Sequence, residues 1–181
     1  MKSQNLFDLS GRVAIVTGGN GGLGLGMALG LAGAGSNIMV AARDGEKTAR
    51  ALPQIEALGV QARGVTADVA QESSIRLMVA RTVEAFGRVD ILVNNAGISV
   101  RKQPEELSTE EWDQVLDVNL RAAFLASREV YPHMKSQGAG KIINIGSMFS
   151  LFGSDWVAPY SASKGGVVQL TKSLAVAWAK D

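Results

Sequence analysis

The 181-residue sequence contains no cysteine and only one histidine, His133. The lack of cysteine excludes disulfide bonds, thiolate nucleophiles and cysteine-ligated metals. A single histidine cannot form a metal cluster by itself, so we expect no metal site. Eighteen basic residues against seventeen acidic ones leave a formal net charge of +1, and no long basic block is present. This balance gives no electrostatic support for nucleic-acid binding.

Long hydrophobic runs are also missing. No stretch is long enough to span a bilayer, and the segment Met1–Ser10 lacks an apolar core of signal-peptide length. We therefore expect a soluble, cytoplasmic protein with no membrane partner. Hydrophobic residues make up 46% of the chain, which is too apolar for disorder. A chain of this length is expected to form one domain with a substantial core.

Short apolar runs alternate with longer helical patterns along the whole chain. The predicted strands are Val13–Thr17, Asn37–Ala41, Val60–Thr66, Val89–Asn94 and Lys141–Ile145. The predicted helices are Gly22–Ala34, Gly45–Leu58, Gln71–Phe86, Thr109–Ser136 and Pro159–Lys180. The strands are almost continuously apolar, which is typical of a sheet covered by helices on both faces. Repeated strand–helix units predict a parallel, doubly wound α/β sheet of the Rossmann type.

The C-terminal part does not fit a complete sheet. The run Ile142–Ile145 is typical of a central strand that has a partner on each side. The helix after it reaches Asp181 with no terminating glycine and no following strand. Because an uncovered apolar sheet edge promotes aggregation, we expect either a domain truncated after this helix or another element covering that edge.

A glycine-rich segment, Thr17–Gly24, follows the first predicted strand and opens the first predicted helix. In that context, glycines let the backbone approach a pyrophosphate closely, and the amides at the helix start attract it. Residues Gly19–Gly24 also fit G-x-G-x-x-G, so two registers of the motif overlap. The alternative is a flexible strand–helix turn. The strand before it and the helix after it favour a nucleotide site.

The end of the second strand indicates which nucleotide is bound. Sites that prefer NAD commonly place an acid here, whereas this chain has Ala42 followed by Arg43. An arginine can bind a 2′-phosphate in bidentate fashion, and no carboxylate stands at that position to repel the phosphate. The pattern favours NADP. Asp44, one residue later, supports NAD instead, and a solvated Arg43 is the structural alternative.

Tyr160 and Lys164 are related as i and i+4 on the last predicted helix, so they share a face. A tyrosine is protonated at neutral pH, but a lysine cation beside it favours the phenolate. The pair is therefore a candidate proton-transfer group, with Ser147 shortly before it. The alternatives are structural: a half-buried aromatic ring, a solvated lysine and a serine that caps the end of a strand.

Five motifs together resemble the short-chain dehydrogenase/reductase family in order and spacing. They are Thr17-Gly18-x-x-x-Gly22-x-Gly24, Asn94-Asn95-Ala96-Gly97, Asn119, Ser147 and Tyr160-x-x-x-Lys164. The resemblance runs from about Leu9 to Asp181. It implies an NAD(P)-dependent enzyme that interconverts an alcohol and a ketone, working as a homo-oligomer, either a dimer or a tetramer. Family members usually continue with two further strands and a loop that closes over substrate, so residues 1–181 would form a dinucleotide-binding catalytic domain without its C-terminal part.

The resemblance also implies a role for each motif residue. Tyr160 exchanges the substrate proton, Ser147 binds the substrate oxygen, Lys164 supports the tyrosine and holds the nicotinamide ribose, and Asn119 holds a water. Asn119 lies in an apolar helical stripe, where a polar amide requires a partner. The implied cofactor contacts are Gly18, Asn20, Gly22, Leu23, Gly24, Arg43, Asp68, Val69, Asn95, Ala96, Gly97, Tyr160 and Lys164.

Within the family, the segments Gly140–Ile145, Ser147-Met148 and Glu111-Trp112 look similar to gluconate and related sugar-acid dehydrogenases. Arg101 follows the Asn-Asn-Ala-Gly segment and is a candidate for attracting the carboxylate of a small acidic substrate, with a solvated loop arginine as the alternative. Two other functions stay open. One is a 3-oxoacyl-carrier reductase with an apolar pocket around Phe149 and Trp156, and the other is an inactive, truncated cofactor-binding fragment.

Overall fold

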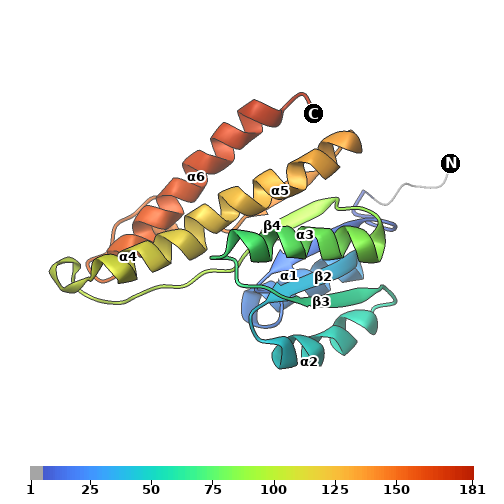
Figure 1. The fold of residues 1–181 in the computed structure, drawn as a ribbon, viewed down its shortest axis with the longest axis horizontal. Helices are drawn as coiled ribbons and strands as arrows, with labels where there is room; N and C mark the ends of the chain where they lie inside the picture. The colour runs from blue at the N-terminus through green and yellow to red at the C-terminus, as the bar shows by residue number, and fades with distance from the viewer. Residues whose placement is uncertain (1–5) are drawn as a thin grey trace.

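The computed structural model describes residues 6–181 as a five-stranded parallel sheet between layers of helices (Figure 1). The strands are β1 (Val13–Thr17), β2 (Asn37–Ala42), β3 (Ala62–Thr66), β4 (Ile91–Asn94) and β5 (Lys141–Asn144). Their order is β3-β2-β1-β4-β5. The predicted fold class is confirmed. The order reverses between β1 and β4, and in such sheets ligands bind at this switch point, outside the carboxyl ends of the strands.

Helices cover both faces of the sheet, which explains why the strands are apolar at nearly every position. Helices α1 (Gly22–Gly33) and α2 (Gly45–Glu56) pack on the face formed by Ala14, Val16, Ile38 and Val40. Helices α3 (Glu72–Phe86) and α5 (Ala122–Ser136) pack on the opposite face, formed by Ile15, Met39 and Leu92. Successive strand residues thus point into different cores.

The predicted helical segment over 109–136 is confirmed, and it contains a π-helical turn that the sequence did not predict. The segment consists of α4 (Thr109–Leu116), a π-helical turn η2 (Asp117–Arg121) and α5. Residues with good helical patterning fill all three parts, so periodicity does not reveal the turn. Ser108 caps α4 through reciprocal hydrogen bonds with Glu111. π-Helical turns occur frequently at functional sites, and this one contains Asn119.

Helix α6 (Ala158–Trp178) runs beside α5, and its N-terminal part packs on α4 and η2 (Figure 1). Gly166 permits the close approach, because a Cβ there would lie 2.7 Å from Leu120 Cδ2. Near the other end of α6, the rings of Tyr131 and Trp178 stack at 4.3 Å. Two short 3-10 helices, η1 (Pro104–Glu106) and η3 (Met148–Ser150), lie in the segments that precede α4 and α6.

Strand β5, whose sequence is typical of a central strand, lies at the edge of the sheet formed by residues 6–181. β5 pairs only with β4, and Ile143 is 44% exposed. A groove of about 500 Å³ runs along this edge between α5 and α6. No helix within the described residues is long and apolar enough to cross a membrane.

Candidate functional site

The loop between β1 and α1 is built for close backbone approach. Gly18 and Gly22 have φ values of +65° and +53°, a left-handed conformation that favours glycine. A Cβ at Gly24 would lie 2.2 Å from the carbonyl oxygen of Gly18, so the first turn of α1 packs directly on the loop. Helix α1 has no side-chain cap and no acidic residue in its first turn. Its first amides therefore remain able to bind an anion.

Polar side chains hold the ends of β1, β4 and β5 together beside this loop. Asn95 Nδ2 donates a hydrogen bond of 2.8 Å to the carbonyl oxygen of Thr17. Thr17 Oγ1 accepts bonds of 3.0 Å from the backbone amides of Asn95 and Ala96. Asn94 Nδ2 donates to Asn144 Oδ1 at 2.8 Å. These bonds fix the strand ends at the point where the strand order reverses.

A cleft of about 700 Å³ lies at the carboxyl ends of β1, β2, β3 and β4, within the usual size range of ligand pockets. Several predicted cofactor residues line it: Gly18, Asn20, Arg43, Asp68, Val69, Ala96 and Gly97. The other predicted cofactor residues do not line it: Gly22, Leu23, Gly24, Asn95, Tyr160 and Lys164. Leu23 is 78% exposed, and Gly24 and Asn95 pack against the loop. Lys47 and Ile98 also line the cleft, although no sequence motif marked them.

Asn119 has the partner that its apolar setting requires. Its side chain is buried and forms two hydrogen bonds with the backbone of Ile98, donating at 2.9 Å and accepting at 2.8 Å. It also donates to Ser163 Oγ at 3.0 Å, and that hydroxyl donates to the carbonyl oxygen of Tyr160 at 2.7 Å. Asn119 thus connects a residue of the cleft wall to the start of α6.

Lys164 and Tyr160 lie one turn apart near the start of α6. The Nζ of Lys164 is 5.6 Å from the centroid of the Tyr160 ring and donates a hydrogen bond of 2.6 Å to the carbonyl oxygen of Ile145. Lys164 is only 4% exposed, and this burial lowers the pKa of its ammonium group. The Phe149 ring packs edge-on against Tyr160 at 6.3 Å. A largely desolvated cation therefore lies beside a half-buried phenol.

The sequence match decides the family. The family model for short chain dehydrogenases matches residues 12–181. The chain belongs to the short-chain dehydrogenase family. Relatives with assigned activities extend this match along nearly the whole chain.

The chain is 45% identical over 175 residues to the 2-dehydro-3-deoxy-D-gluconate 5-dehydrogenase of Escherichia coli K12, covering 96% of this chain and 68% of that protein. It is 39% identical over 180 residues to the gluconate 5-dehydrogenase of Gluconobacter oxydans, covering 99% and 70%. A crystal structure of xylitol dehydrogenase with NAD⁺ bound matches with a TM-score of 0.91 at 33% identity, covering 94% and 66%. The chain spans about two thirds of the length of these relatives.

In this short-chain dehydrogenase, Ser147 caps η3. Its Oγ accepts a hydrogen bond of 3.2 Å from the backbone amide of Phe149, and its own amide donates to Ser150 Oγ at 3.1 Å. Within residues 6–181, Ser147 forms no hydrogen bond with Tyr160, and neither residue lines the 700 Å³ cleft. The bond from Lys164 to Ile145 places the segment that leads into Ser147 against α6.

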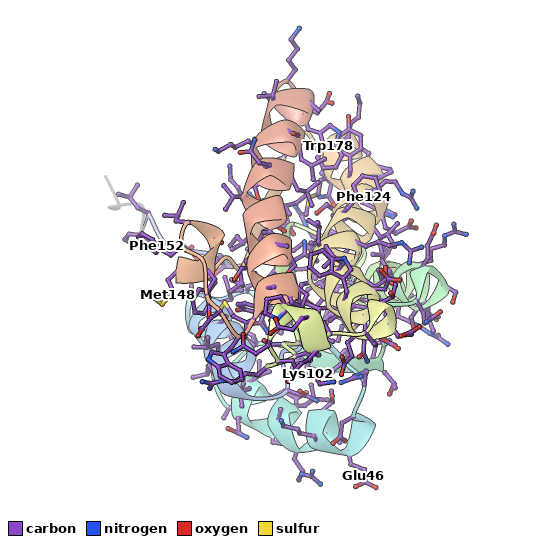
Figure 2. The ribbon with its side chains drawn as sticks, turned by 90° about the vertical axis from the view of Figure 1, so that its left-hand side faces the viewer. Glu46, Lys102, Phe124, Met148, Phe152 and Trp178 are labelled. Carbon is purple, nitrogen blue, oxygen red and sulfur yellow. The ribbon has the colours of Figure 1, made fainter. Side chains whose placement is uncertain are left out.

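The segment after β4 is tied to the segment before α6. The backbone amide of Lys102 donates a hydrogen bond of 2.9 Å to the carbonyl oxygen of Trp156, and Lys102 Nζ pairs with Glu111 at 2.5 Å. The guanidinium of Arg101 lies 5.8 Å from the centroid of the Trp156 ring. Figure 2 labels Lys102, and it labels Met148 and Phe152, which project from the segment between β5 and α6.

Proposed function

We propose that the protein is an NAD(P)-dependent oxidoreductase that interconverts an alcohol and a ketone on a sugar acid or polyol, and that it prefers NADP. The observation that carries this proposal is the buried Lys164 ammonium 5.6 Å from the Tyr160 ring centroid. A cation so placed favours the phenolate form of a tyrosine. Asn119 and Ile98 connect this pair to the cleft.

The residues of the cleft fit a nicotinamide dinucleotide. The glycine loop packs closely on the first turn of α1 at Gly18 and Gly24, and a pyrophosphate would bind at the amides that open this helix. Arg43 would meet the adenosine ribose, Asp68 and Val69 the adenine, and Ala96 and Gly97 the middle of the cofactor. Lys164 would hold the nicotinamide ribose. When bound, the nicotinamide supplies the hydride chemistry.

Protein groups supply the proton chemistry in this mechanism. As a phenolate, Tyr160 takes the proton of the substrate hydroxyl during oxidation, and as a phenol it returns that proton during reduction. The hydroxyl of Ser147 donates a hydrogen bond to the substrate oxygen, where negative charge develops. Lys164 stabilises the phenolate, and its bond to Ile145 keeps the ammonium in place. Asn119 holds the start of α6 through Ser163.

Charge on the segment after β4 supports an acidic substrate. Lys102 is neutralised by Glu111, whose pKa is lowered by the hydrogen bond from Lys102. Arg101, by contrast, forms no ion pair with any described residue and stacks on Trp156. Stacking leaves the positive charge of a guanidinium intact, so Arg101 remains available to a carboxylate. The gluconate dehydrogenases among the relatives agree with this substrate class.

A second candidate is the reduction of a carrier-bound 3-oxoacyl group. It is favoured by the apolar side chains of the segment between Ser147 and Tyr160. Met148 is 67% exposed, Leu151 81% and Phe152 64%, and such a surface suits an acyl chain.

Apolar side chains on α4 and α5 support association into a homo-oligomer. Trp112 and Phe124 are each 39% exposed on these helices, and exposed aromatic side chains are common at protein interfaces. Light scattering on the purified protein measures the subunit number.

An assay of the nicotinamide absorbance tests the proposed function. The purified protein is given NADP⁺ or NAD⁺ with sugar acids and polyols, and NADPH or NADH with 3-oxoacyl thioesters. We expect the fastest turnover with a sugar acid and NADP⁺. Faster turnover of thioesters would favour the second candidate. Cofactor binding without turnover of any substrate would identify a cofactor-binding protein that lacks activity.

A further inference from the structure

The charged side chains of the 700 Å³ cleft are Arg43, Asp44, Lys47 and Asp68. Both carboxylates already accept backbone hydrogen bonds: Asp44 from the amide of Lys47 at 2.8 Å, and Asp68 from the amide of Ala70 at 3.1 Å. Arg43 and Lys47 form no ion pair with any of residues 6–181. The cleft therefore contains two cations whose charge no protein carboxylate neutralises through an ion pair.

Hydrogen bonds around the start of α2 fix the position of the Lys47 ammonium group. Asn20 Nδ2 donates hydrogen bonds to the carbonyl oxygen of Asp44 at 3.2 Å and to Thr48 Oγ1 at 3.1 Å. These bonds tie the glycine loop to the start of α2, where the Asp44 cap fixes the Lys47 backbone. The lysine side chain then extends over the loop, since a Cβ at Gly21 would lie 2.6 Å from Lys47 Nζ.

Because residue 21 is a glycine, the space that a side chain would occupy there is filled by the ammonium group of Lys47 from helix α2. The loop Gly18–Gly24 contains no basic residue of its own. Lys47 supplies positive charge to the loop, and Arg43 supplies it at the end of β2. Both side chains line the same cleft and are separated in sequence by the start of α2.

We propose that Lys47 and Arg43 together form a clamp for the 2′-phosphate of NADP, an inference that rests on the proposed nucleotide-binding function. A phosphate monoester carries between one and two negative charges near neutral pH and offers three acceptor oxygens, so it can engage both cations. The 2′-hydroxyl of NAD carries no charge, so a second cation adds little to the binding of NAD. Lys47 is thus a specificity-determining residue that helps discriminate between the two dinucleotides.

Equilibrium titrations with NADPH and NADH, followed by nicotinamide fluorescence, test the clamp in Lys47→Met. We expect the Kd for NADPH to rise at least tenfold, which corresponds to about 1.4 kcal/mol, while the Kd for NADH changes less than twofold. Lys47→Arg is expected to keep the preference for NADPH. Arg50→Met is the matched control, because Arg50 lies on the same helix, pairs with Glu46 and does not line the cleft. It should change neither Kd.

Several results would overturn the clamp. An equal loss of affinity for NADPH and NADH would place Lys47 at the pyrophosphate that both cofactors share. Unchanged affinities in Lys47→Met would remove Lys47 from the site. A wild-type protein with no preference for NADPH would also overturn the clamp while leaving dinucleotide binding intact. If the wild-type protein bound neither nucleotide, the proposed function would fail together with the clamp.

Discussion

Asn119 is bound to Ser163 by a hydrogen bond of 3.0 Å, and this bond joins the π-helical turn η2 to the start of α6. Replacing Asn119 with leucine removes this bond and leaves the Ile98 amide and carbonyl without their partner. A buried polar group without a partner costs about 1–3 kcal/mol. We therefore expect Asn119→Leu to lower the free energy of unfolding by at least this amount, as measured by urea denaturation.

Gln114→Leu is the control for that substitution, because it makes a similar change in polarity on α4, where Gln114 is exposed. It should alter the free energy of unfolding by less than about 0.5 kcal/mol. If both variants were equally stable, the bonds of Asn119 would contribute nothing to holding α6.

Helix α1 offers two glycines with opposite expectations for the same substitution. A Cβ at Gly24 would lie 2.2 Å from Gly18 O and 2.5 Å from Asn95 Nδ2, so Gly24→Ala must displace the loop. It should weaken cofactor binding at least tenfold and lower the melting temperature. A Cβ at Gly26, on the same helix, would meet no neighbouring atom within 4 Å, so Gly26→Ala should stabilise the protein by about 0.5–1 kcal/mol. Equal behaviour of the two variants in calorimetry and cofactor titration would contradict this account of the loop.

The ionisation of Asp90 makes the free energy of unfolding depend on pH. Burial acts to raise the pKa of Asp90, but hydrogen bonds from Arg88, Arg12 and the Val13 amide outweigh it and hold the pKa below its ordinary value. A carboxylate with a depressed folded-state pKa stabilises the protein above its unfolded-state pKa, and this contribution is lost as the pH falls through the folded-state pKa.

Asp90→Asn should therefore lower the free energy of unfolding at neutral pH by about 1–3 kcal/mol. The difference from the wild type should shrink below about pH 4, where the carboxyl group starts to be protonated in the unfolded chain. Urea denaturation across this pH range measures it, with Asp113→Asn as the exposed control. A difference that stays constant with pH would contradict the role given to the carboxylate charge.

Arg101→Ala tests the recognition of an acidic substrate. Because Arg101 forms no ion pair with described residues, its loss should raise the Michaelis constant for a sugar acid about tenfold or more, while the constant for a neutral polyol stays within twofold. Lys102 is already paired with Glu111. Its replacement should therefore change the Michaelis constants for the sugar acid and for the neutral polyol to the same extent. Michaelis constants that change equally for acidic and neutral substrates would exclude Arg101 as a carboxylate ligand.

The sheet and its helices were predictable from the sequence because the strands are mostly apolar on both faces and turn residues separate them from the helices. Strands β3 and β4 begin two residues later than predicted, at Ala62 and Ile91, since a single valine, Val60 or Val89, precedes each strand in the connecting segment. The π-helical turn η2 was not predictable. Its apolar residues continue the helical pattern of the flanking segments, and the turn is singled out by the packing of α6 on Leu120 and by the bonds of Asn119.

For the candidate site, motif residues were found and their neighbours were not. Arg43 follows the end of the second strand, where the charge of the side chain indicates which dinucleotide is bound. The sequence therefore predicted it as a cofactor residue. Lys47 lies on an ordinary polar helix face, and its approach to Gly21 depends on how Asn20 ties α2 to the loop. Ile98 contributes backbone groups, which no side-chain pattern can reveal.

The central claim is that Tyr160 exchanges the substrate proton beside Lys164, and Tyr160→Phe tests it most directly. The phenyl ring preserves packing against Phe149, so the Kd for NADPH should stay within twofold of the wild-type value. Tyr131→Phe is the control, since Tyr131 stacks on Trp178 and bonds Asp181, apart from the candidate site. We predict that turnover falls at least about 100-fold in Tyr160→Phe and is unchanged in Tyr131→Phe. Turnover in Tyr160→Phe within a few-fold of the wild-type rate would contradict the account.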